Sequence, residues 1–171
     1  MDGKARLATL LFVLSFLATG VAQAANPLTV TGTANIAFDI PLTINKNSDI
    51  NFGSVKARIA DTYTINTAGT VSHTGSGAIL TGTPTVGDLT ITGSTNQGIT
   101  ISAGNYIANS GVTPANARGK YGTGAEQSFP ITGAAPGAGT HLKLGVSVTA
   151  NGTQASDVTA TPTFDITVVY Q

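Results

Sequence analysis

Side chains able to bind a metal or transfer protons are few in this chain, and they stand far apart. Its two histidines, His73 and His141, lie in or beside Thr- and Gly-rich stretches, and neither has a Cys or an acidic residue at ligand spacing. A zinc site needs three or four converging ligands, so we interpret both as turn or surface residues. The eight Asp and Glu residues are dispersed, so the sequence pairs no two of them as a catalytic acid and base.

One segment has the spacing of a calcium loop. Residues 45–51, Asn-Lys-Asn-Ser-Asp-Ile-Asn, place oxygen-bearing side chains at alternate positions. The Gly after the third ligand and the distal Glu of such loops are missing, so a polar turn before a strand is favoured. The chain also has no Gly-x-Ser-x-Gly elbow, no Cys and no phosphate-binding Gly-rich loop. We therefore expect no enzyme, with no catalytic residue, no metal and no cofactor.

A recognition site is the remaining kind of chemistry. Residues 106–124 read as a long loop that holds Tyr106, Arg118 and Tyr121. Aromatic rings and a guanidinium on a loop suit a glycan, because loops carry recognition more often than cores do. A surface loop without a ligand is the alternative.

The N-terminus predicts export. Two basic residues precede an apolar run at residues 7–21, and residues 22–24, Ala-Gln-Ala, form a small-x-small cleavage pattern. We expect a signal peptide at residues 1–24 and a mature chain, residues 25–171, that forms one domain. The mature protein would cross a bacterial periplasm and end at the cell surface or outside it. The apolar run is shorter than a membrane span needs, so no transmembrane anchor is expected after cleavage.

Composition and patterning predict the fold class. Charged residues are 9% of the chain and scattered, which gives no basis for nucleic-acid binding. Short runs that alternate between apolar and polar residues recur between Gly, Asn, Pro and Ser clusters, and no segment shows a sustained helical period. The spacing predicts an all-β, Ig-like antiparallel β-sandwich of about eight or nine short strands. Within it, residues 88–92 and 99–103 are expected to pair as a hairpin.

The N-terminal run of the mature chain has the strictest alternation. Within residues 28–40 the even positions are apolar or Gly and the odd positions are mostly Thr, Asn and Asp, until Pro41 ends the run. The even row consists of Val30, Gly32, Ala34, Ile36, Phe38 and Ile40. Such a segment is either the first strand of its own sheet or a donor strand for a neighbouring subunit, and both alternatives are open at this point.

Three segments resemble the family called domain of unknown function 4402, exported bacterial β-sandwich proteins of no settled activity. They are Asn51-Phe52-Gly53-Ser54-Val55, residues 88–101 with their Asp-Leu-Thr-Ile-Thr-Gly and Gly-Ile-Thr-Ile runs, and residues 163–170, Thr-Phe-Asp-Ile-Thr-Val-Val-Tyr. The resemblance covers nearly all of the mature chain and implies a β-sandwich.

More widely, the chain resembles fimbrial subunits that assemble by donor-strand exchange. This resemblance implies that residues 28–40 fill a groove in the next subunit. It also implies that a periplasmic chaperone pairs with the C-terminal edge strand, whose apolar row is Phe164, Ile166, Val168 and Tyr170. Common pilins carry a disulfide, and this chain has no Cys.

The sequence thus predicts a structural subunit of a surface fimbria or similar filament. Its expected partners are other copies of itself or related subunits. The alternative is a monomeric secreted module that binds a glycan or another surface polymer.

Overall fold

The computed structural model describes residues 32–36 and 38–171. The predicted signal at residues 1–24 and Val30 of the predicted donor row lie outside the described residues. The chain divides into two units, Met1–Ile36 and Ala37–Gln171, and all the strands described below belong to the second.

Ten strands and no helix are found among the described residues. The strands are β1 (Thr43–Ser48), β2 (Ala60–Ile65), β3 (Val71–His73), β4 (Gly87–Thr92), β5 (Ile99–Ile107), β6 (Val112–Tyr121), β7 (Gln127–Ser128), β8 (Ile131–Gly133), β9 (Thr140–Asn151) and β10 (Thr163–Tyr170). They form two antiparallel sheets, so the predicted antiparallel β-sandwich is confirmed. The count exceeds the predicted eight or nine because strands as short as β7, with two residues, carry no readable alternation.

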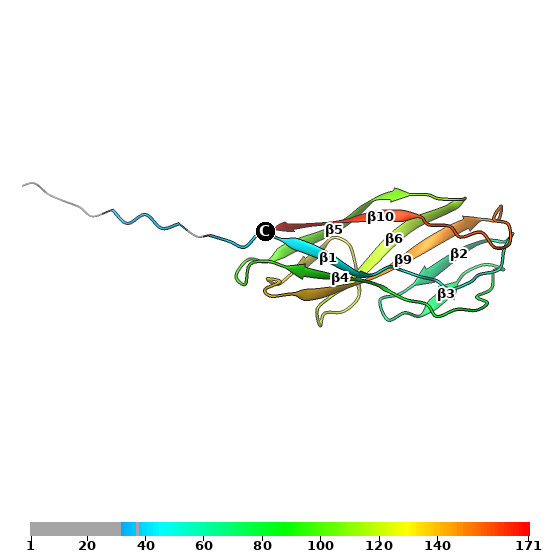
Figure 1. Ribbon diagram of the computed structural model, residues 1–171, viewed down its shortest axis with the longest axis horizontal. Helices are drawn as coiled ribbons and strands as arrows, with labels where there is room; N and C mark the ends of the chain where they lie inside the picture. The colour runs from blue at the N-terminus through cyan, green and yellow to red at the C-terminus, as the bar shows by residue number, and fades with distance from the viewer. Residues whose placement is uncertain (1–31, 37) are drawn as a thin grey trace, which may run out of the picture. The chain divides into compact units, whose positions relative to one another are not determined.

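The long strand β9 organises the larger sheet (Figure 1). β6 pairs along one edge of β9 for most of its length, while β4 and β2 pair in succession along the other edge. β1 then pairs with β4, β3 with β2, and β7 with β6. One apolar row runs along β9, and all its members are buried: Leu142, Leu144, Val146, Val148 and Ala150. This single strand therefore lines the core under both halves of the sheet.

The smaller sheet has the order β10-β5-β8. Its central strand presents Ile99 and Ile101 to the larger sheet, where they are buried with Leu89 and Ile91 of β4. A second buried cluster surrounds Tyr63 of β2 and includes Ile65, Ala117, Val146, Val148 and Ala150. The core thus lies between the two sheets as two apolar clusters that share the row of β9.

Paired hydroxyls lie on the outer face of the larger sheet. Three pairs join neighbouring strands with oxygen–oxygen distances of 2.6 to 2.9 Å: Thr43–Thr92, Thr62–Thr149 and Thr64–Ser147. Such cross-strand pairs each contribute roughly 0.2–1 kcal/mol to a sheet. The Thr-rich alternation of the sequence is therefore explained by strand-to-strand contacts.

The predicted hairpin of residues 88–92 and 99–103 is wrong. β4 and β5 both form, but they belong to different sheets. β4 pairs with β1 and β9, and β5 pairs with β8 and β10. The apolar rows of the two strands face each other across the core, so the connection at residues 93–98 crosses from one sheet to the other.

The predicted loop at residues 106–124 is also wrong. β5 continues to Ile107, and after a tight turn at Ser110 and Gly111 the chain returns as β6. Asn105 and Asn116 take left-handed φ values of 49° and 51° inside these strands. Asn adopts this conformation more readily than most residues. These Asn residues therefore accommodate local strand irregularity and do not mark a loop.

Asp61 is a buried carboxylate that ties β2 to the segment after β3. It accepts hydrogen bonds from the N–H groups of Thr62 at 2.7 Å, Gly75 at 2.5 Å and Gly77 at 2.7 Å. The Nδ1 of His73 lies 3.0 Å from the same carboxylate. Burial raises the pKa of Asp61, but these hydrogen bonds favour the ionised form more strongly, and the resulting pKa is about 2.

Replacing Asp61 should make folding less sensitive to acid. Because its folded pKa lies below the ordinary value of 3.8, its contribution to stability is present above roughly pH 4 and is lost as the pH falls towards 2. We expect Asp61→Asn to have a lower Tm than the wild type at pH 7. The difference in Tm between the two proteins should shrink as the pH falls from 4 to 2, because the wild type then loses the contribution of Asp61. Thermal unfolding followed by circular dichroism measures both effects.

Asp88→Asn is the matched control, because Asp88 pairs with the largely exposed His141. It should change the Tm less than Asp61→Asn does. Parallel acid profiles for the wild type and Asp61→Asn would contradict the role given to Asp61.

Candidate functional site

A long groove opens along one side of the sandwich. It has a volume of about 1730 Å³. Its lining comes from β10, from β1 with the following residues 49–57, and from residues 154–162. Part of the apolar row of β9 also faces it, with Leu144, Val146, Val148 and Ala150. The groove therefore lies between an edge strand of each sheet, with an apolar floor from β9 and a rim of mixed polar and apolar residues.

The strand β10 forms a groove wall whose core-facing side chains are only half covered. Among the described residues, β10 pairs with β5 alone, so its other edge carries unpaired backbone groups. The predicted edge row, Phe164, Ile166, Val168 and Tyr170, lies on this strand with intermediate exposure throughout. On the neighbouring β5, Ile99 and Ile101 are 0% exposed. This is the difference between an edge strand and the central strand of the same sheet, and it leaves Phe164 and Ile166 open to the groove.

At the other edge of the larger sheet, local features disrupt strand pairing. The register between β6 and β9 shifts between Ala115 and Arg118. The Tyr106 hydroxyl accepts a hydrogen bond from the Ala117 N–H at 3.2 Å. Phe129, between β7 and β8, packs against both core clusters. Since bulges and covering side chains protect sheet edges from further pairing, the groove side is better suited to receive a strand.

The described part of the predicted donor row is exposed and forms no strand. Exposed fractions are 75% for Ile36, 86% for Phe38 and 60% for Ile40, and Gly32 and Ala34 are exposed as well. The alternative in which residues 28–40 are the first strand of their own sheet is not seen in this part, because the first described strand is β1. Large apolar side chains exposed in an alternating row are a feature of interaction segments.

The chain just before β1 is tied to the end of β10. The Tyr170 hydroxyl donates to the Ile40 carbonyl at 2.5 Å and accepts from the Ser94 N–H at 2.6 Å. The Ser94 hydroxyl donates to the Asp39 carboxylate at 2.9 Å. We call Asp39, Ile40, Ser94 and Tyr170 the junction cluster. It fixes the backbone at the root of an otherwise exposed segment.

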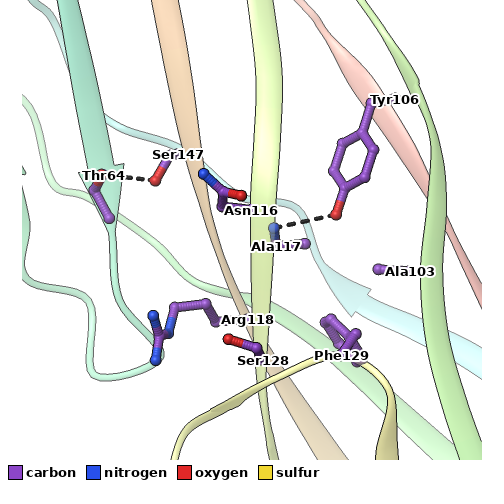
Figure 2. A pocket seen from close by; sticks show the side chains of 9 residues that line it. All are labelled: Thr64, Ala103, Tyr106, Asn116, Ala117, Arg118, Ser128, Phe129 and Ser147. Atoms are coloured by element: carbon purple, nitrogen blue, oxygen red, sulfur yellow. Dashed lines mark hydrogen bonds between the residues drawn. The ribbon is translucent and has the colours of Figure 1, made fainter.

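The predicted recognition residues are brought together only in part. Tyr106 and Arg118 line one pocket of about 590 Å³ beside β6, as Figure 2 shows. Tyr121 lies outside this lining, and its hydroxyl donates to the Ala134 carbonyl at 3.1 Å. Tyr106 stacks on Phe164 with ring centroids 5.8 Å apart. The Nε of Arg118 lies 2.9 Å from the Glu126 carboxylate, so both pocket residues are already held by the chain itself.

Two interpretations of polar residues change with the structure. Each histidine has an acidic neighbour in space, His73 at Asp61 and His141 at Asp88. Sequence spacing missed both, because the partners come from other strands. The predicted polar turn at residues 45–51 is largely strand β1, and that expectation is wrong. Within the part of the chain that the structure describes, no three His, Cys, Asp or Glu residues converge as metal ligands do.

Comparison with known families gives a match that includes every strand described above. The sequence matches the family described as a domain of unknown function, DUF4402, over residues 42–170. The chain belongs to DUF4402. No curated protein and no solved structure matches it. The match begins after Ile40, so the predicted donor row lies outside the region that matches the DUF4402 family.

The described residues include no helix with the length and apolar character needed to cross a membrane.

Truncating the groove wall should cost less stability than truncating the closed part of the same sheet. Ile101→Ala removes a side chain that is 0% exposed, and such changes cost about 2–5 kcal/mol. Ile166→Ala should cost clearly less in the isolated subunit, because Ile166 is already partly exposed. Urea denaturation of the two variants gives the comparison. Equal losses in unfolding free energy would show that the groove is filled in solution.

Proposed function

We propose that this DUF4402 protein is an exported structural subunit of a cell-surface fimbria or similar filament, assembled by adding a β-strand from one subunit to the next. The observation that carries the proposal is the presence, in one chain, of an open groove with an apolar floor and an exposed segment with strand alternation. The groove offers the free edge of β10, and the segment offers Ile36 and Phe38 on one face.

An added strand would pair with the free edge of the sandwich and would also cover the apolar floor of the groove. Its backbone would pair with the free edge of β10, and its alternate side chains would contact the apolar row of β9. Burying four or five such side chains is worth on the order of 8–12 kcal/mol before the cost of ordering the segment. Gly32 within the row would allow a close approach to the groove, where a larger side chain would collide.

The free edge of β10 would also need a protein partner during export. An unpaired strand beside a half-covered core is an aggregation hazard. A periplasmic chaperone that pairs with β10 would cover that edge until another subunit arrives. The permanent partners are then other copies of this chain or related subunits, outside the cell.

A monomeric glycan-binding module is the second candidate. It is supported by the pocket that Tyr106 and Arg118 share. It is the weaker candidate because the Tyr106 hydroxyl and the Arg118 Nε already have partners within the chain. A glycan array with the purified protein tests it, and binding that Arg118→Ala abolishes would favour it.

The decisive experiment on assembly compares the mature chain, residues 25–171, with a version that lacks residues 25–38. We expect the mature chain to form SDS-resistant ladders. The shortened chain should remain a monomer that binds a synthetic peptide of residues 28–38. Size-exclusion chromatography with light scattering measures both. A monomeric mature chain at high concentration, with no uptake of the peptide, would refute strand addition.

A point substitution tests the donor row without shortening the chain. Phe38→Asp should abolish polymerisation and leave export intact, because a charge cannot be buried in an apolar groove without a large cost. Ile107→Asp is the control, since Ile107 is also exposed, at 52%, but lies outside the groove and the donor row. Filaments of normal length from Phe38→Asp would exclude the role given to this segment.

A further inference from the structure

A subunit that carries both a donor segment and an open groove faces a competing reaction with itself. A tethered segment has an effective concentration on the order of millimolar, far above that of a second subunit in dilute solution. We call the insertion of a subunit's own segment into its own groove self-filling. Self-filling is therefore favoured over insertion into a second subunit unless the chain prevents it. This argument rests on the proposed function, because it takes the groove as the acceptor for residues preceding Pro41.

Self-filling has an obvious route in this fold. Among the described residues, β1 pairs only with β4, and its remaining edge borders the groove. A hairpin with residues 39–42 as its turn would fold the donor row back along β1, directly into the chain's own groove. Loops of this length are common in β-hairpins.

The junction cluster holds these same turn residues in another conformation. Residues 38–42 contain neither a turn nor a bend. The Ile40 carbonyl is bound by the Tyr170 hydroxyl, and the Asp39 carboxylate by the Ser94 hydroxyl. Forming the hairpin turn would therefore break contacts to two residues that are themselves fixed in the domain.

The partners of these contacts are rigidly placed. Ser94 is only 3% exposed. The backbone around it is paired with the next loop, with Gly93 N–H donating to the Gly137 carbonyl at 3.0 Å and Gly137 N–H donating to the Ser94 carbonyl at 3.1 Å. A side chain at Gly93 would collide with the Tyr170 hydroxyl and with Leu42. The glycine at this position therefore lets Tyr170 approach without a shift of its ring or of Leu42.

We propose that the junction cluster is a latch that keeps a subunit's donor segment out of its own groove and so reserves that groove for a second copy of this chain. The latch also limits the donor: Ile40 stays bound to its own domain, and the row that enters the neighbour ends at Phe38. Tyr170 is then a positioning residue for assembly, placed at the C-terminal end of β10.

Cysteine cross-linking separates self-filling from filling by a second copy. The chain has no Cys, so Ala34→Cys on the donor segment and Ser54→Cys on the groove lining introduce a unique pair in the full mature chain. With the latch intact, a bifunctional maleimide should give mainly dimers and longer ladders. Adding Tyr170→Phe keeps the ring and removes the hydroxyl with its two hydrogen bonds. The ratio of internally linked monomer to linked oligomer should then rise about tenfold.

Tyr106→Phe is the matched control, because it also removes a hydroxyl bonded to the backbone but lies away from the junction cluster. It should leave the ratio unchanged when it is compared with the parent at the same protein concentration. Ser94→Ala should shift the ratio in the same direction as Tyr170→Phe. Thermal unfolding confirms that each variant is folded.

The outcomes distinguish the latch from the proposed function. Ladders from the parent with the same ratio in Tyr170→Phe would overturn the latch and leave strand addition standing. Internally linked monomer from the parent would overturn both the latch and assembly through a second copy. The absence of any donor-to-groove cross-link in the parent would overturn the proposed function itself.

Discussion

The apolar row of β9 is the constraint on which the rest of the structure depends. This strand offers two hydrogen-bonding edges, and β6, β4 and β2 are all placed by them. Its inward side chains, from Leu142 to Ala150, serve both core clusters. The same row faces the groove, so the surface available to an added strand is a continuation of the core. The floor of the groove therefore cannot be made polar without damage to the fold.

Alternation in the sequence identifies faces of strands but not their partners. It located β9, β10 and the exposed row before β1, because each is a run with a strict period of two. It failed for β4 and β5, since a period of two does not say whether two strands lie side by side or face each other across a core. It also failed between Tyr106 and Tyr121, where Asn and Gly residues that suit loops occupy irregular positions in long strands.

The site was predictable only at its apolar parts. The predicted donor row and the β10 row are visible as patterns, whereas the junction cluster joins Asp39 and Ile40 to residues more than fifty positions away. The contacts of Asp61 were also not predictable, because its partners are mostly backbone N–H groups, which every residue type except proline carries. The junction cluster joins distant segments, whereas Asp61 closes a local stretch that ends at Gly77. Both are polar contacts that tie the backbone together in a chain without Cys. The hydroxyl pairs on the outer face add further uncharged links, which screening by salt leaves largely unaffected.

The position of Tyr170 has a mechanical consequence for any filament built in the proposed way. A neighbour's donor strand would lie along β10, and the subunit's own donor segment leaves from Ile40, which Tyr170 binds at the end of that same strand. Tension along the filament would therefore enter each subunit at β10 and leave it through β1, into which the donor segment continues. Both strands would be loaded in shear along their hydrogen bonds to β5 and β4. Resistance to stretching would then depend on these two edge strands, and on the Tyr170 hydroxyl bond where they meet, more than on the overall stability of the fold.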